Sequence, residues 1–179
     1  MVLRTLILVS FTATFFLING CTSSIHEAIS SDTSVLQDGI YLVERKGLKP
    51  KEILPLADHE KIITFNQEFI DKTDQGKIYV VVNKQEFAPL ILKQAPTTQD
   101  QEDNRKRLML TLSDKASDLL KQFTTRNLNR HTSIVVDGEA LTMHKVRTVI
   151  DGGRLQVTRC TDNACEMLFF QLQDNVVKD

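Results

Sequence analysis

The second half of the chain contains the pattern of a strand, a capped helix and a further strand. Leu108–Leu112 is a continuous apolar run, and the hydroxyl of the following Ser113 can accept a hydrogen bond from the first amides of a helix. The apolar residues that come next have the spacing of one helix face: Ala116, Leu119, Leu120 and Phe123. We expect this helix to end near Asn127, and Ile134–Val136 to form the next strand. One stripe of the helix must therefore face a core.

Several other segments are typical of strands and tight turns. Asp137-Gly138 stands between two extended segments, and this pair favours a hairpin turn whose central residues have positive φ. Leu90–Leu92 is predicted to be an edge strand, because Pro89 has no N–H to donate to a ladder. Residues 96–105 are expected to be a loop. The tail over 163–172 has the apolar spacing of a helix, whereas its Phe169-Phe170 pair suits a strand, and we favour the helix. The other predicted strands are Gly39–Val43, Lys61–Phe65, Ile78–Val82 and Arg154–Thr158.

The N-terminus has the organisation of an export signal. A cationic start at Arg4 precedes an apolar stretch over 5–16, and the small residue Gly20 stands directly before Cys21. Residues 18–21 resemble the lipobox of bacterial lipoprotein precursors, and this resemblance implies that Cys21 receives a thioether-linked diacylglycerol and becomes the acylated N-terminus. The alternatives are an ordinary secretory signal, cut near Gly20, and an uncleaved membrane anchor.

This interpretation divides the chain into a signal peptide over 1–20, a Ser/Thr/Asp-rich tether over 21–38 and a single domain over 39–179. The formal net charge of -1 argues against nucleic acid as a partner, because binding to phosphates needs a basic face. We expect the mature chain to lie on the periplasmic side of the envelope, held to the bilayer by acylated Cys21. Thr22 follows that cysteine, and in lipoproteins of Gram-negative bacteria a residue other than aspartate there indicates the outer membrane.

Three segments in a fixed order resemble the head of the first periplasmic domain of SecD, the export-assisting partner of the bacterial Sec translocon: 108–120, Ser133–Glu139 and Ile150–Thr158. The resemblance implies an α+β, ferredoxin-like head with an antiparallel sheet and one main packing helix. It also implies, at most, the head's proposed role of contacting translocated polypeptide. SecD carries membrane helices that line a proton path, and this sequence has no such helix after Cys21. Proton-driven export is therefore not carried over.

Two cysteines remain if Cys21 is acylated. Cys160 and Cys165 form an even pair, and an oxidising periplasm permits a disulfide between them. The alternative is a redox or metal pair, although their C-x4-C spacing differs from the C-x-x-C of such sites.

Gly152-Gly153-Arg154 is the candidate binding segment. Successive backbone amides beside a cationic side chain can form an anion-binding nest, and the alternative is a tight turn that leaves Arg154 exposed. None of the four histidines has the spacing of a metal site, and no nucleophile elbow or phosphate-binding loop is present. We therefore predict no catalytic residue, metal ligand or cofactor.

The sequence thus predicts a non-catalytic, membrane-anchored periplasmic lipoprotein. Its partners would be unfolded or translocating polypeptide, or Sec-associated envelope proteins, with a link to protein export. An exposed sheet edge near Ile134–Val136 or Leu90–Leu92 could accept an extended peptide by strand addition. The alternatives are a structural component of an envelope complex and an envelope hydrolase with an unrecognised site.

Overall fold

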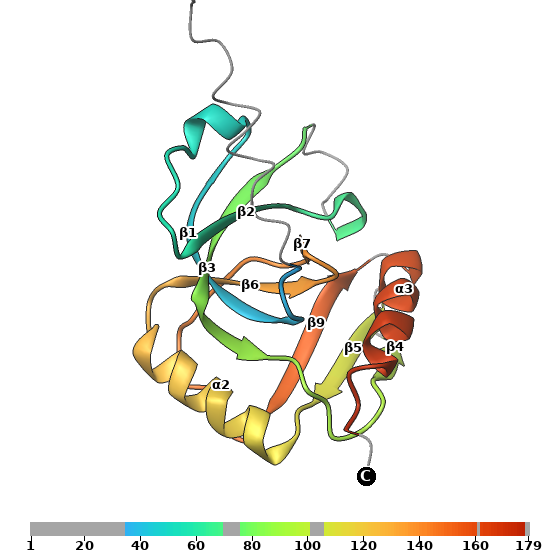
Figure 1. Cartoon of the computed structure of the whole chain (residues 1–179). Helices are drawn as coiled ribbons and strands as arrows, with labels where there is room; N and C mark the ends of the chain where they lie inside the picture. The colour runs from blue at the N-terminus through green and yellow to red at the C-terminus, as the bar shows by residue number, and fades with distance from the viewer. Residues whose placement is uncertain (1–34, 70–75, 101–105, 161, 178–179) are drawn as a thin grey trace, which may run out of the picture. The chain divides into compact units, whose positions relative to one another are not determined.

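The structure, a computed structural model, describes residues 35–69, 76–100, 106–160 and 162–177. Their strands form a six-stranded sheet and a three-stranded sheet, against which α2 and α3 pack (Figure 1). The strands are β1 (Gly39–Gly47), β2 (Glu60–Thr64), β3 (Tyr79–Pro89), β4 (Thr97–Asp100), β5 (Lys106–Thr111), β6 (His131–Val136), β7 (Glu139–Ala140), β8 (His144–Lys145) and β9 (Arg154–Cys160). The helices are α2 (Asp114–Arg126) and α3 (Asp162–Gln173), with short 3-10 helices η1 (Pro50–Glu52) and η2 (Gln67–Phe69). The predicted α+β class is confirmed.

The six-stranded sheet curves into an antiparallel half-barrel. Its order is β2-β3-β1-β6-β7, and β8 also pairs with β6. The first and last strands meet where Phe65, directly after β2, forms a parallel bridge with Ala140 of β7. Asn66 reinforces this closure, because its backbone N–H donates to the Ala140 carbonyl at 2.8 Å and its side-chain amide donates to Glu139 Oε2 at 2.7 Å.

Strand β1 separates two apolar clusters, because successive side chains of a strand point to opposite faces. Ile40 and Leu42 belong to the larger cluster, which includes residues of α2, α3, β5 and β9. Tyr41 and Val43 belong to the second cluster, which is shared by β1, β2, β3, β6 and β7. The half-barrel therefore has its own core, while its other face helps to bury both helices and the small sheet.

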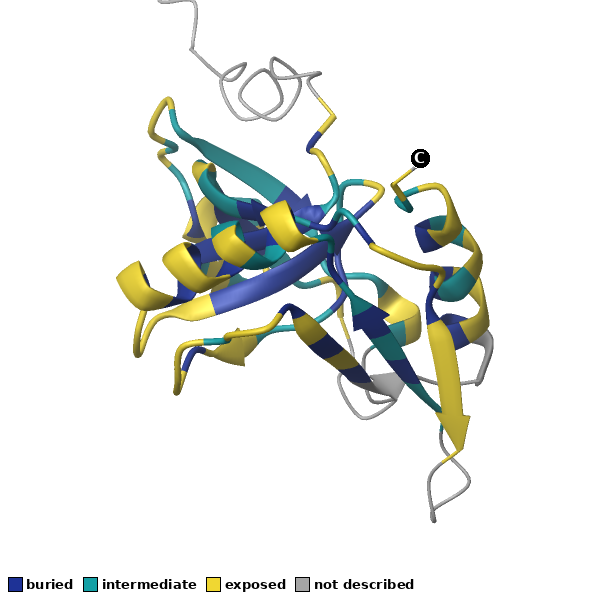
Figure 2. Cartoon of the chain, turned by 90° about the horizontal axis from the view of Figure 1, so that it is seen from below, coloured by how far each residue is buried: buried dark blue, intermediate teal, exposed yellow. Residues whose placement is uncertain are grey.

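The helices follow the sequence prediction. Ser113 caps α2 by accepting a hydrogen bond from the Ala116 amide at 3.3 Å, and the helix ends at Arg126 with Asn127 as its C-cap. Ala116, Leu120 and Phe123 are buried, and Figure 2 shows the outer face of α2 exposed. The tail does form a helix, α3, which contacts β5 and β9.

Three features differ from the sequence analysis or extend it. Thr97–Asp100 is a strand within the predicted loop, because it pairs with β5. Packing begins before the Gly39 boundary, since Leu36 is buried in the second cluster. The half-barrel and the β4-β5-β9 sheet are the observed arrangement, and the ferredoxin-like organisation of the head stays a prediction. In the described part of the chain, no helix has both the length and the apolar character needed to cross a bilayer.

Candidate functional site

Both sheet edges that the sequence suggested for peptide binding are covered. β6 lies between β1 on one side and β7 and β8 on the other, so Ile134–Val136 is in an interior strand. Leu92 bridges Leu112 on one side and Val176 on the other. The prediction that these two edges are exposed was therefore wrong. Their neighbours come from distant parts of the chain, and an apolar run by itself does not reveal which strands flank it.

The open edge belongs to β4. This strand is at the end of the β4-β5-β9 order, and all four of its residues are exposed (Figures 1 and 2). Among the described residues, no segment other than β5 pairs with it. The sequence analysis missed this edge, although the β-branched pair Thr97-Thr98 after Pro96 was a signal for a strand. At the other end of the sheet, β9 contacts η2 and α3.

The hydrogen-bond pattern tells which groups of β4 face outward. The Leu112 amide donates to the Gly153 carbonyl at 2.9 Å, so the even-numbered residues of β5 are bonded to β9 and the odd-numbered ones to β4. Thr97 and Gln99 lie opposite odd-numbered residues of β5. The backbone N–H and C=O groups of Thr98 and Asp100 therefore point away from the sheet.

A polar and cationic face adjoins this edge. In the registers of β4, β5 and β9, one face of the small sheet carries Arg107, Met109, Arg154 and Gln156, and we call these residues together with β4 the small-sheet surface. Arg154 and Gln156 are exposed. Arg107 is partly buried, and its Nε is buried with no hydrogen-bond acceptor among the described residues. The surface thus carries one guanidinium group, that of Arg107, on the strand next to β4, and a second, that of Arg154, on β9 at the other end of the sheet.

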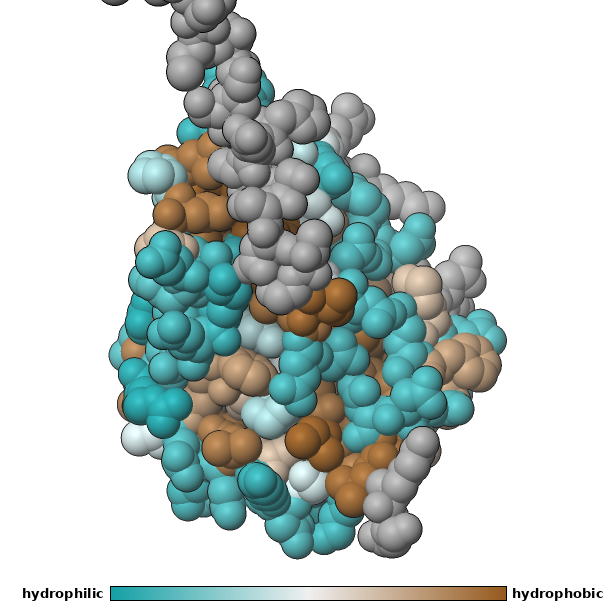
Figure 3. Space-filling model, in the orientation of Figure 1, coloured by the Kyte–Doolittle hydropathy of each residue, from teal (hydrophilic) through white to brown (hydrophobic). Residues whose placement is uncertain are grey.

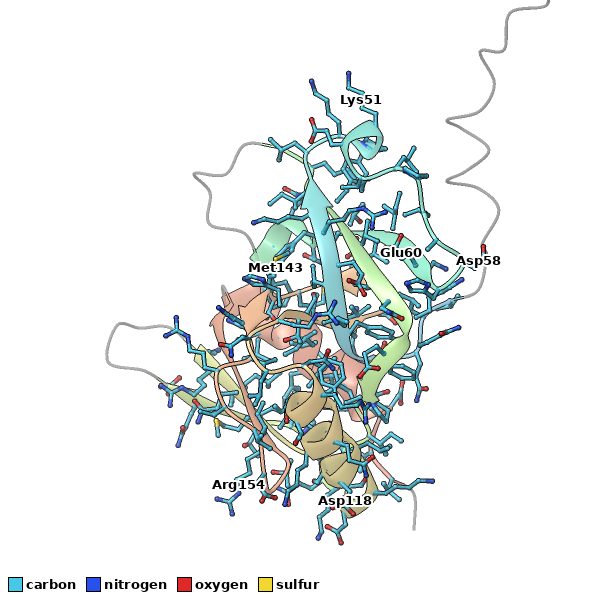
Figure 4. The ribbon with its side chains drawn as sticks, turned by 90° about the vertical axis from the view of Figure 1, so that its left-hand side faces the viewer. Lys51, Asp58, Glu60, Asp118, Met143 and Arg154 are labelled. Carbon is cyan, nitrogen blue, oxygen red and sulfur yellow. The ribbon has the colours of Figure 1, made fainter. Side chains whose placement is uncertain are left out.

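The Gly152-Gly153-Arg154 segment makes a turn into β9. The pKa of the Asp151 carboxyl is lowered because Lys121 donates a hydrogen bond to it at 2.9 Å and, to a smaller degree, because the Gly152 amide also does. The amide that a nest would offer to an anion is therefore directed at a carboxylate of the chain itself. Arg154 points away from the fold (Figure 4). Anion binding at these residues stays a prediction.

Of the three cysteines, the structure describes the side chain of Cys165 alone. Cys21 lies outside the described residues, so its acylation stays a prediction. Cys165 is fully buried and disulfide-bonded, and its sulfur lies 3.6 Å from the Lys106 carbonyl oxygen. The side chain of Cys160 lies outside the described part of the chain, so the pairing of the two cysteines also stays a prediction.

The perturbed titratable groups are tied to structural contacts. Arg45 holds both oxygens of Glu60, at 2.5 and 2.9 Å, and this pairing lowers the pKa of the Glu60 carboxyl. Burial, with a smaller effect of Asp38, raises the pKa of Tyr41 to about 12. The Tyr41 ring stacks on Phe87 with centroids 4.8 Å apart. In the described ranges, no three His, Cys, Asp or Glu side chains gather as metal ligands would.

A pocket of about 300 Å³, open to solvent, lies between residues 37–38, 90–91 and 174–176. Asp38 joins the segments around it. Its Oδ1 accepts from the Asp137 amide at 3.0 Å, its Oδ2 from the Asn175 side chain at 2.9 Å, and its carbonyl from the Leu90 amide at 3.0 Å. On the face shown in Figure 3, apolar residues form separate patches among hydrophilic ones.

Comparison with known proteins gives one family match. A sequence model of the SecDF P1 head subdomain matches residues 64–175 of the chain. None of the curated proteins matches this chain.

Three solved SecDF structures are similar to the chain, each at 14% sequence identity. SecDF in its super-membrane-facing form has a TM-score of 0.48, over 76% of this chain and 18% of that chain. A structure of SecDF, a membrane component that enhances protein export, has a TM-score of 0.43, over 77% of this chain and 62% of that chain. SecDF from Thermus thermophilus, a translocon-associated membrane protein, has a TM-score of 0.37, over 78% of this chain and 29% of that chain. This chain therefore spans less than two thirds of each of them.

Proposed function

Since the chain belongs to the family of the SecDF P1 head subdomain, we propose that it is a non-catalytic, membrane-anchored lipoprotein of the periplasm that binds extended polypeptide in support of protein export. This proposal includes the acylation of Cys21, the location of the protein at the outer membrane and the ferredoxin-like organisation of the head. The observation that carries the binding role is the open edge of β4.

An open strand edge suits a protein that must hold many different sequences. Strand addition uses backbone groups, which every polypeptide has, and side-chain pockets add selectivity. The small-sheet surface has backbone groups directed outward at Thr98 and Asp100, and the solvent-open pocket at residues 37–38, 90–91 and 174–176 is lined by none of its residues. Arg107, opposite Gln99 on the strand next to β4, favours segments that bring carbonyl or carboxylate oxygens to that face. Binding there would be tolerant of sequence, with a preference for acidic or polar segments.

The same geometry sets the expected affinity. Two outward-facing residues offer up to about four backbone hydrogen bonds, each with a net contribution of about 1 kcal/mol. A total of about 4 kcal/mol, before the cost of association is subtracted, corresponds to a Kd no tighter than about 1 mM. Such an edge would hold a chain briefly and release it, as transient contact with a moving polypeptide requires.

Proline at position 98 tests the edge. Thr98→Pro removes an N–H that points away from β5, so the pairing of β4 with β5 should survive while strand addition is blocked. We expect a soluble peptide of alternating threonine and valine with terminal glutamates to shift the NMR signals of β4 and β5 in the native protein. Thr98→Pro should weaken this binding by about tenfold or more, because each lost hydrogen bond and the ring's steric clash act together.

Thr98→Ala is the matched control, because it changes the side chain and keeps the N–H. It should bind the peptide as the native protein does. Equal binding by Thr98→Pro, with β4–β5 signals intact, would reject β4 as the site. Peptide-induced shifts confined to other strands would reject it as well.

The anchor is tested separately. Protein isolated from membranes of its own host should yield an N-terminal peptide that begins at Cys21 and carries acyl chains in mass spectrometry. Cys21→Ala should move the protein from the membrane fraction to the soluble fraction, because alanine has no thiol to carry the acyl chains that hold the protein to the bilayer. An unmodified thiol at position 21 in the mature protein would remove the anchor from the proposal and leave the β4 test unaffected.

A further inference from the structure

A second strand-accepting edge lies at Ile91–Lys93, and the chain covers it with its own residues. The segment Asn175–Val177 follows α3 and runs parallel to Leu92. The Leu92 amide donates to the Asn175 carbonyl at 2.8 Å, and the Val177 amide donates to the Leu92 carbonyl at 2.9 Å. This contact is strand addition within one molecule. It shows that the edge receives an extended segment in parallel orientation.

The contact has two elements of side-chain recognition. Asn175 donates its side-chain amide to Asp38 Oδ2 at 2.9 Å, and Asp38 is itself fixed by the amide of Asp137. Val176 is partly buried and packs against the larger apolar cluster. The edge thus selects an amide side chain followed by a β-branched apolar one. A carboxylate in place of the amide would face Asp38 and be repelled.

The covering segment is short. Besides the Asp38 bond and the Val176 packing, its backbone makes two hydrogen bonds with Leu92 and one with the end of α3, where the Asn175 amide donates to the Leu172 carbonyl at 3.2 Å, and Val177 is 44% exposed. The solvent-open pocket of about 300 Å³ lies directly beside it, lined in part by Asn175 and Val176. A short segment with few buried contacts opens more readily than the sheets on which it lies. Space for an incoming chain and a weakly held occupant are therefore found at the same place.

We propose that Ile91–Lys93 is a strand-accepting site in which Asn175–Val177 acts as a displaceable occupant. Its competing ligand is an extended polypeptide that runs parallel to Leu92 and presents an amide residue followed by a β-branched residue. The site does not depend on β4, so it stands or falls independently of the proposed function. While the occupant is bound, its tethering gives it a high effective concentration, and a free peptide competes poorly.

Proline at position 177 tests this proposal in the full chain. Val177→Pro removes the amide that donates to the Leu92 carbonyl, whereas Val177→Ala keeps that amide and changes only a half-exposed side chain. The probe is a fluorescently labelled peptide with the sequence of residues 171–178, and its binding is measured by fluorescence anisotropy. We expect Val177→Pro to bind this peptide about tenfold more tightly than the native protein and Val177→Ala do, because the tethered competitor is weakened. The same peptide with Asn175→Asp should not bind.

Hydrogen exchange of the native protein gives a second readout that needs no variant. The amides of Leu92 and Val177 should exchange about a hundredfold faster than those in the pairing of β1 with β3, since local opening exposes only the segment. Peptide binding that is equal in Val177→Pro and Val177→Ala would overturn the proposal. The proposal would also be overturned if the Leu92 amide were as strongly protected from exchange as the amides of the β1–β3 pairing. This second test uses the native protein, so it holds even if Val177→Pro does not fold.

Discussion

Gly153→Ala should destabilise the protein by about 3 kcal/mol. Gly153 has a φ of +63°, and an L-residue there costs about 1–2 kcal/mol. An added Cβ would also overlap Ser117 Oγ and lie 2.8 Å from Ser117 Cβ, at the start of α2. Overpacking of this kind costs about 1–3 kcal/mol. Because the Gly153 carbonyl accepts the Leu112 amide, relief of the clash would pull β9 away from β5. Urea unfolding followed by circular dichroism measures the loss.

Gly152→Ala is the matched control for this prediction. Gly152 has a φ of +89° but no atom within 4 Å of an added Cβ, so only backbone strain of about 1–2 kcal/mol is expected. Ser117→Gly combined with Gly153→Ala should recover the part that comes from the overlap, after correction for Ser117→Gly alone. Equal losses from the two glycine substitutions would show that close packing against α2 is not the reason for a glycine at 153.

Arg45→Met should destabilise the protein by a similar amount, about 3 kcal/mol. Arg45 donates to the Ile53 carbonyl at 2.8 and 2.9 Å, to the Pro55 carbonyl at 2.6 Å and to both oxygens of Glu60. Methionine keeps the apolar stem and removes all of these donors. The Glu60 side chain is only 9% exposed, and a nearly buried carboxylate without its cation costs about 3–5 kcal/mol. The 34% exposure of Arg45 places the expected value at the lower end.

Arg126→Met is the control, because the Arg126–Glu86 pair is more exposed, at 56% and 28%. Its loss should be below about 1 kcal/mol, as for other surface pairs. A loss for Arg45→Met that is no larger than for Arg126→Met would contradict the role of Arg45 in joining β1 to the 53–60 segment.

The Arg45–Glu60 pair also predicts how stability depends on pH. The hydrogen bond from Arg45 lowers the pKa of folded Glu60 below the ordinary value of 4.5. Its contribution is therefore fully present above pH 4.5 and is lost as the pH falls through the lower folded value. Arg45→Met should lose stability less steeply over this acid range than the native protein. Parallel pH profiles of the two proteins would show that Glu60 gains no stabilisation from Arg45.

Local patterns were sufficient for most elements of the fold. The Ser113 cap, the apolar stripe of α2 and the hairpin at Asp137-Gly138 depend on residues close in sequence, and the structure has all three. Asp137 and Gly138 have φ of 50° and 77°, as the turn requires. The similarity to the SecD head was also readable from segment order, and the family match agrees with it.

The sequence by itself therefore determined the identity of the main strands and helices. Helices are specified by capping and apolar periodicity within a few residues, and strands by short apolar runs between turn residues. Only the tertiary structure decided which edges are open. Ile134–Val136 and Leu90–Leu92 have the composition of good edge strands, yet β7, β8 and the Asn175–Val177 segment cover them. Thr97–Asp100 lies in a polar stretch that we predicted to be a loop, and its Thr97-Thr98 pair was the one local signal for a strand, yet it is the exposed end of the small sheet. Which backbone groups remain for a partner is settled by long-range pairing, and no local pattern encodes that pairing.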